Sequence, residues 1–98
     1  GRVWKRDELE AILELCIEND IVVFADEIHS DLVYAPNVHI PFASLNAKAR
    51  EITLTAIGVG KSFNMAGFAM SSVVVPNEAV RQRFKKSYDR VHFAQGAV

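Results

Sequence analysis

The chain has 98 residues, of which 50% are hydrophobic and 23% are charged, a composition typical of a globular protein rather than a disordered or fibrous one. Its 11 basic and 12 acidic residues give a net charge of -1, which argues against non-specific binding to nucleic acid or to acidic membranes. No apolar run approaches the ~20 residues of a membrane-spanning helix. The single cysteine, Cys16, excludes an internal disulfide and fits a reducing compartment.

The N-terminal part of the chain predicts a helix followed by a strand. In residues 7–19 apolar side chains recur at helical spacing and glutamates take the other face, which indicates an amphipathic helix. Its apolar residues are Leu9, Ile12, Leu13, Cys16 and Ile17. We expect Cys16 to be a buried structural thiol on that face. The continuous β-branched run 21–25 predicts a strand covered on both faces, as in a parallel sheet.

Two further strands and a second helix are predicted in the C-terminal part. Residues 52–57 and 70–75 favour β structure, and the connection between them is too short for a parallel crossover, so we expect this pair to be antiparallel. Asn77 predicts a cap for a helix over 78–90. The basic residues of that helix indicate a solvated face, with an anion site as the alternative; they are Arg81, Arg83, Lys85 and Lys86. This order predicts an α/β fold in which the two helices cover a mostly parallel sheet with one reversed strand.

Polar residues gather where the first strand ends, and ligands bind at the carboxyl ends of strands in open α/β sheets. Asp26 would either cap a turn or pair with a buried cation such as a pyridinium nitrogen. His29 would be a polar loop residue or would face the same ligand as Asp26. A metal site is the other alternative, with further ligands drawn from Glu27, Asp31 and His39. These spacings are common and no second tight pair supports them, so we expect no metal.

Lys61 follows the second predicted strand and is the only charged residue between Glu51 and Glu78. It would be either an ordinary surface lysine or a partly desolvated one. Desolvation lowers the pKa of a lysine, and a lowered pKa suits Schiff-base chemistry with a carbonyl group.

Together these segments resemble the pyridoxal-phosphate enzymes of the aspartate-aminotransferase fold, and among them the cystathionine β-lyase-like group of C–S lyases. The stretches that carry the resemblance are 1–4, 26–32, 39–42, 61–67 and 75–77. The Asp-Glu-Ile-His run that begins at Asp26 and the Lys-Ser-Phe-Asn run that begins at Lys61 are the most specific of them. The resemblance implies that residues 1–98 are a fragment of the cofactor-binding large domain, a partial three-layer αβα sandwich.

The resemblance also implies roles for individual residues. Lys61 would hold pyridoxal 5'-phosphate covalently as a Schiff base and move the α-proton of the substrate. Asp26 would keep the pyridine nitrogen protonated, and His29 would lie near the cofactor 3-oxygen. Two departures concern the cofactor phosphate. Gly60 stands where the family usually has serine, and Ala69 stands where ordinary aminotransferases have arginine.

The activity implied for the parent protein is α,β-elimination from cysteine S-conjugates such as cystathionine. Transamination by the same fold and a catalytically inactive fragment or paralogue are the alternatives, and we expect the isolated chain to be inactive. His29 and the lack of arginine at Ala69 favour the lyase. The parent is expected to be a cytoplasmic homodimer that acts on a small amino-acid substrate and binds neither nucleic acid nor a membrane.

Overall fold

The computed structural model describes residues 1–91, which form helices and strands in an alternating order. The elements are α1 (Arg6–Glu18), β1 (Val23–Asp26), η1 (Phe42–Ser44), α2 (Ala47–Ile52), β2 (Thr53–Ile57), α3 (Val59–Ser62), η2 (Ala66–Phe68), β3 (Ser72–Val74) and α4 (Glu78–Val91). Among the described helices, none has both the length and the apolar character needed to cross a membrane.

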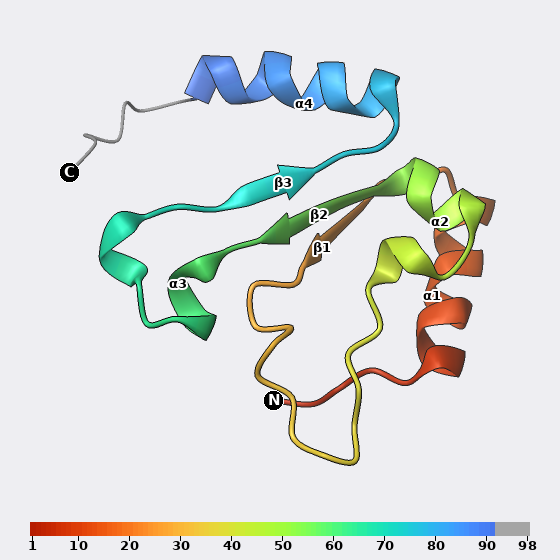
Figure 1. The fold of residues 1–98 in the computed structure, drawn as a ribbon. Coiled ribbons are helices and arrows are strands. Elements are labelled where there is room, and N and C mark those ends of the chain that lie inside the picture. The colour runs from red at the N-terminus through yellow and green to blue at the C-terminus, as the bar shows by residue number, and fades with distance from the viewer. Residues whose placement is uncertain (92–98) are drawn as a thin grey trace.

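The three strands form one sheet in the order β1-β2-β3 (Figure 1). β1 and β2 are parallel, with Asp26 opposite Ala56. β2 and β3 are antiparallel, with Ile57 opposite Ser72. The segment between β2 and β3 turns back on itself without crossing the sheet, as its short length requires. The predicted α/β fold with one reversed strand is confirmed.

The start of β2 is set by α2, which includes the first residue of the predicted strand 52–57. The side-chain oxygen of Asn46 accepts a hydrogen bond from the Ala49 N–H at 2.9 Å and so begins α2. That helix includes Ile52, which was predicted to open the strand. The Thr53 hydroxyl then donates to the Ala49 carbonyl at 2.6 Å, and the strand begins at Thr53. β1 and β3 are also shorter than the predicted strands 21–25 and 70–75.

The core lies on the side of the sheet that α1 and α2 cover (Figure 1). The predicted inner face of α1 is confirmed, because Leu9, Leu13 and Cys16 are buried. Cys16 is a free thiol on that face, as expected. The remaining buried core residues next to α1 are Phe42 and Ala49.

The expectation that the first strand is covered on both faces is not met within the described chain. Burial alternates along β1, and Phe24 is 57% exposed. The physical reason is that α1 and α2 pack on one face only, while α4 lies beyond β3 at the edge of the sheet (Figure 1). Of the two helices expected to cover the sheet, α1 covers one face, whereas α4 lies at the edge beyond β3.

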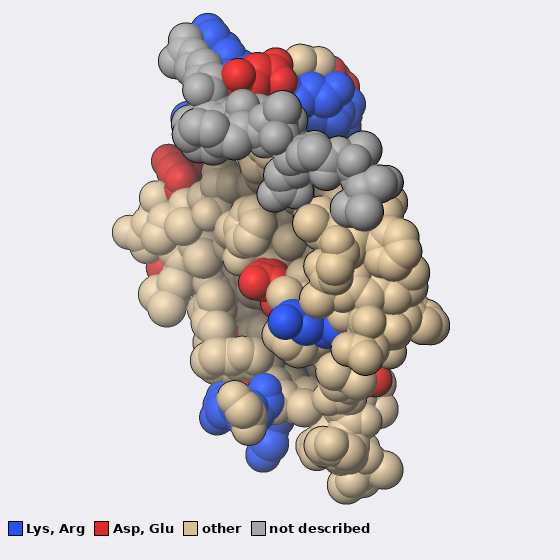
Figure 2. Space-filling model, turned by 90° about the vertical axis from the view of Figure 1, so that its left-hand side faces the viewer, with Lys and Arg blue, Asp and Glu red and all other residues tan. Residues whose placement is uncertain are grey.

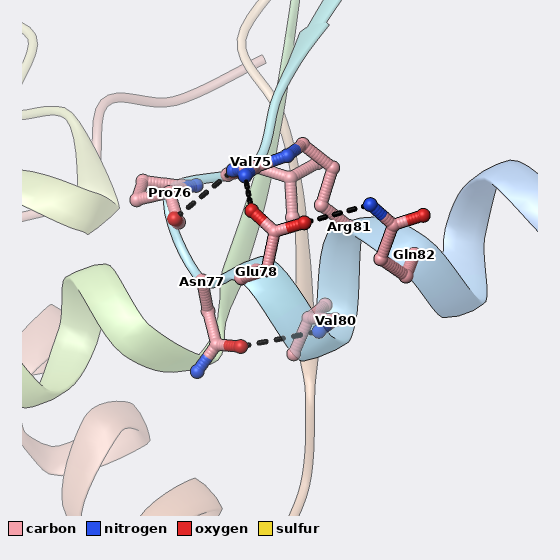
Figure 3. Close-up of polar contacts among 7 residues, drawn as sticks. All are labelled: Val75, Pro76, Asn77, Glu78, Val80, Arg81 and Gln82. Carbon is pink, nitrogen blue, oxygen red and sulfur yellow. Dashed lines mark hydrogen bonds and ion pairs between the residues drawn. The ribbon is translucent and has the colours of Figure 1, made fainter.

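The beginning of α4 is fixed by Asn77, as the sequence predicts (Figure 3). Its Oδ1 accepts a hydrogen bond from the Val80 N–H at 3.1 Å, which satisfies one of the free amide groups of the first turn. Its Nδ2 donates to Glu51 Oε2 at 2.8 Å and so ties the start of α4 to α2. Asn77 therefore has both a local capping contact and a long-range contact.

Arg81 also holds this turn, although it was expected on the solvated face of α4. Its guanidinium donates to the carbonyl groups of Val75 at 2.8 Å and Pro76 at 3.1 Å, and pairs with Glu78 (Figure 3). These contacts satisfy strand-end carbonyls that precede the helix. The other basic residues of the predicted cluster are exposed: Arg83, Lys85 and Lys86.

We predict that Asn77→Ala lowers the free energy of unfolding by about 1 kcal/mol, because the Val80 N–H loses its acceptor. Asn77→Ser keeps a capping hydroxyl but cannot bridge to Glu51, so its loss should be smaller. Urea denaturation of both variants measures the difference, with the exposed Lys85→Ala as the control. Equal losses for alanine and serine would assign the stabilisation to the Glu51 contact and contradict the cap.

Candidate functional site

The predicted site residues lie on two segments that extend from one edge of the sheet. Asp26 ends β1 opposite Ala56 of β2, and the Glu27 N–H continues the ladder by donating to the Ala56 carbonyl at 2.9 Å. Lys61 lies in α3, which follows β2 almost at once. Because parallel strands have their carboxyl ends at the same edge, the pairing of β1 with β2 brings the two segments together there. Figure 2 looks onto this side of the molecule, whose middle is mostly uncharged with a few acidic and basic side chains.

Asp26 and His29 share the turn that follows β1. Asp26 Oδ1 accepts a hydrogen bond from the Ile28 N–H at 3.3 Å, so one carboxylate oxygen does cap the turn. Within residues 1–91 its Oδ2 has no partner. Both Asp26 and His29 line a pocket of about 450 Å³. Lys61 is not among the residues that line this pocket.

The walls of this pocket come from segments far apart in the sequence. They include the N-terminal Val3 and Trp4, the end of β1, and the loop that carries His39 and Ile40. Three of the stretches that carry the family resemblance, 1–4, 26–32 and 39–42, therefore contribute to one cavity. The sequence alone did not predict that these three stretches share a cavity.

The N-terminal wall is held by a charged contact next to α1. The Arg2 guanidinium lies over the Trp4 ring, with Cζ 4.3 Å from the ring centroid, and pairs with Glu8 at 2.5 Å. The hydrogen bond from the Lys5 N–H, with a further contribution from Arg2, lowers the pKa of the Glu8 carboxyl below its usual value. The lowered pKa keeps Glu8 ionised and paired with Arg2 over a wider pH range.

Glu27, which the sequence suggested only as a metal ligand, has a structural role that was not predicted. Its side chain is 9% exposed, and its Oε1 accepts a hydrogen bond from the Phe42 N–H at 2.9 Å. Its Oε2 lies 3.1 Å from His39 Nε2, outside hydrogen-bond geometry, so this buried nitrogen has no hydrogen-bond partner among the described residues. Glu27 therefore ties the 39–42 loop to the end of β1. A charged residue directly after an apolar strand was the available signal.

The described residues contain no group of three His, Cys, Asp or Glu side chains arranged to hold a metal ion. Glu27 and His39, two of the five residues considered for such a site, instead contact each other and the loop backbone.

Lys61 lies on a short helical turn at the open edge. The Phe63 N–H donates to the Val59 carbonyl and the Met65 N–H donates to the Gly60 carbonyl, both at 3.0 Å. The Lys61 side chain is exposed, and across residues 1–91 its ammonium has no hydrogen-bond or ion-pair partner. Within the described residues the expected partial desolvation is therefore not met, because α3 contains no buried residue.

Gly60 and Ala69, the two departures from the family pattern, differ in backbone conformation, because only Ala69 has a positive φ. A Cβ added at Gly60 would lie 3.6 Å from the Ala66 Cα, an ordinary van der Waals distance, so serine would fit there. Packing within the described chain does not account for the glycine. Ala69 has a φ of 47°, a left-handed conformation that is uncommon for a residue with a side chain.

We predict that Glu27→Ala lowers the free energy of unfolding by about 1–3 kcal/mol, because the Phe42 N–H loses its acceptor in a partly buried position. Glu27→Gln keeps an amide oxygen for that N–H and should lose less. Chemical denaturation compares the two, with Glu14→Ala on the exposed side of α1 as the control. A glutamine variant as unstable as the alanine variant would contradict the role of Glu27 as the acceptor for Phe42.

Comparison with known proteins places this arrangement in context. Residues 1–98 match the family model described as aminotransferase class I and II. The chain is 40% identical over 90 residues to the cystathionine beta-lyase PatB of Bacillus subtilis, which covers 92% of this chain and 23% of PatB. It is 36% identical over 81 residues to the human kynurenine–oxoglutarate transaminase 1, which covers 83% of this chain and 19% of that protein.

The fold of the chain is also similar to that of a solved structure. Cystalysin from Treponema denticola, whose crystal structure contains a pyridoxal 5'-phosphate cofactor, superposes with a TM-score of 0.91 at 36% identity. The match covers 100% of this chain and 25% of cystalysin. The chain thus spans a quarter or less of the length of these three relatives.

Proposed function

Because the chain belongs to the aminotransferase class I and II family, we propose that it is part of the cofactor-binding large domain of a pyridoxal-phosphate-dependent enzyme. The observation that carries this proposal is the parallel pairing of β1 with β2, after which Asp26 and Lys61 follow at the same edge of the sheet. An amine and a carboxylate are the two groups that this cofactor requires, one for its aldehyde and one for its ring nitrogen. When bound, pyridoxal phosphate supplies an electron sink for a carbanion at the substrate α-carbon.

Each of the three residues has a role that suits its surroundings. Lys61 would hold the cofactor through its amine and would move the α-proton, and this amine has no hydrogen-bond or ion-pair partner among the described residues. Asp26 would accept the ring N–H with its Oδ2, while its Oδ1 accepts the hydrogen bond from the Ile28 N–H. A carboxylate near a protonated nitrogen raises the pKa of that nitrogen. His29 lies on the same turn and lines the same pocket as Asp26, which suits a contact with the cofactor ring.

For the reaction of the whole protein we propose α,β-elimination from cysteine S-conjugates such as cystathionine. Lys61 would remove the α-proton, and the thiolate would leave from Cβ. Hydrolysis of the remaining three-carbon part of the substrate, which still contains the amino nitrogen, would release pyruvate and ammonia. The 40% identity to cystathionine beta-lyase PatB supports this choice. The 36% identity to a kynurenine–oxoglutarate transaminase supports transamination as the second candidate. We also propose that the enzyme is a cytoplasmic homodimer, in keeping with a single free thiol and with the open face of the sheet.

We predict that Lys61→Ala in the full-length protein abolishes the visible absorbance band of the bound cofactor, because the covalent attachment is lost. Lys48→Ala, at an exposed lysine of α2, is the matched control and should keep the band. Borohydride reduction, digestion and mass spectrometry should find the cofactor on the peptide that contains Lys61. A band that persists in Lys61→Ala, or a label on another lysine, would contradict the proposed attachment site.

The products distinguish the two reactions. We predict that the full-length protein releases pyruvate and ammonia from cystathionine without any added keto acid. Lactate dehydrogenase coupling measures the pyruvate. Turnover of an amino acid that depends on added 2-oxoglutarate, with no pyruvate from cystathionine, would replace the lyase by a transaminase.

A further inference from the structure

We propose that Asp31 is a positioning residue for Lys61 and acts through Ser62. The Ser62 hydroxyl donates a hydrogen bond to Asp31 Oδ2 at 2.6 Å. A bond of this length between a hydroxyl and a carboxylate is charge-assisted and stronger than a neutral hydrogen bond. The proposal rests on the proposed function of Lys61. It gives a role to Asp31, which the sequence suggested only as a ligand of a metal site that was not expected.

The turn that carries Lys61 has little else to hold it in place. α3 has four residues and η2 has three, and neither contains a buried residue. A helix of one turn is unstable by itself, because nucleation fixes several dihedral angles for a single hydrogen bond. Within the described chain, the bond to Asp31 is the only side-chain hydrogen bond between residues 58–70 and any other segment. It therefore restricts the backbone from which the Lys61 side chain leaves.

Asp31 lies in a turn that backbone hydrogen bonds hold together. The Ser30 N–H donates to the Glu27 carbonyl at 3.0 Å and the Leu32 N–H donates to the His29 carbonyl at 2.9 Å. Asp31 thus belongs to the same folded segment as Asp26 and His29. The bond to Ser62 joins the segment that holds the proposed ring contacts to the segment that holds the proposed attachment point.

The two segments are thereby joined at two places. The Glu27 N–H bonds to the Ala56 carbonyl at the end of the sheet, and Asp31 bonds to Ser62 farther along both turns. A pocket of about 370 Å³ lies between them, lined from one side by Glu27 and Asp31 and from the other by Gly58 and Phe63. Because the space between the turns is open, the second bond rather than packing sets their separation. The separation in turn sets where the Lys61 amine lies relative to Asp26.

The test uses the full-length holoenzyme with Ser62→Ala and Asp31→Asn, and with Ser62→Thr as the variant that keeps the hydroxyl. Ser87→Ala, at an exposed serine of α4, is the control. We expect Ser62→Ala to lower kcat roughly tenfold to hundredfold with little change in KM, as for a misplaced catalytic group. Ser62→Thr should restore most of the rate. The Asp31→Asn, Ser62→Ala double variant should lose no more than Ser62→Ala alone, since both changes affect one bond.

A measurement on the cofactor-free protein tests the structural effect of the Ser62–Asp31 hydrogen bond separately from its effect on the reaction rate. In the cofactor-free protein, Ser62→Ala should increase amide hydrogen exchange across residues 58–70 and leave α1 unchanged. Unchanged exchange, or increased exchange with normal kcat in the holoenzyme, overturns the positioning role. If the wild-type protein gives neither a visible band nor a borohydride label on Lys61, the proposed function fails and the positioning role falls with it. A normal band and label in the wild type with wild-type kcat in Ser62→Ala refutes the positioning role alone.

Discussion

The parallel pairing of β1 with β2 is the constraint on which the candidate site depends. A parallel register sends both chains out of the sheet at the same edge, so residues about 35 positions apart in sequence become neighbours in the fold. The pairing requires a crossover, and the chain between the strands supplies it as the loop and the α2 helix that pack against α1. The Glu27 N–H extends the ladder by one bond to the Ala56 carbonyl, which fixes the start of the polar turn.

Much of this arrangement could be predicted from local sequence. The apolar face of α1, the cap at Asn77 and the reversal between β2 and β3 each follow from spacing, residue type or connection length, and all are confirmed. These features are decided by neighbours in sequence, so a single sequence contains the information. The gathering of Asp26 and Lys61 at one edge also follows once the strands are taken as parallel.

What could not be predicted depends on contacts between distant residues or on what covers a surface. Ile52 has the β-branched side chain of a strand residue, yet the Asn46 cap extends α2 through it. Phe24 has the sequence context of a doubly covered strand, yet the described helices leave it 57% exposed. Lys61 is exposed for the same reason. Apolar pattern reports which residues favour burial, but burial itself needs a partner surface.

The adjacent carboxylates Asp26 and Glu27 show how hydrogen bonding separates structural from chemical roles. Glu27 is nearly buried, with one oxygen bound to the Phe42 N–H and the other beside His39. A carboxylate used in this way stabilises the fold through its contacts with the 39–42 loop. Asp26 is exposed and uses only one oxygen in the turn. The two alternatives considered for Asp26, a turn cap and a partner for a cation, are therefore compatible, because each needs only one of its oxygens.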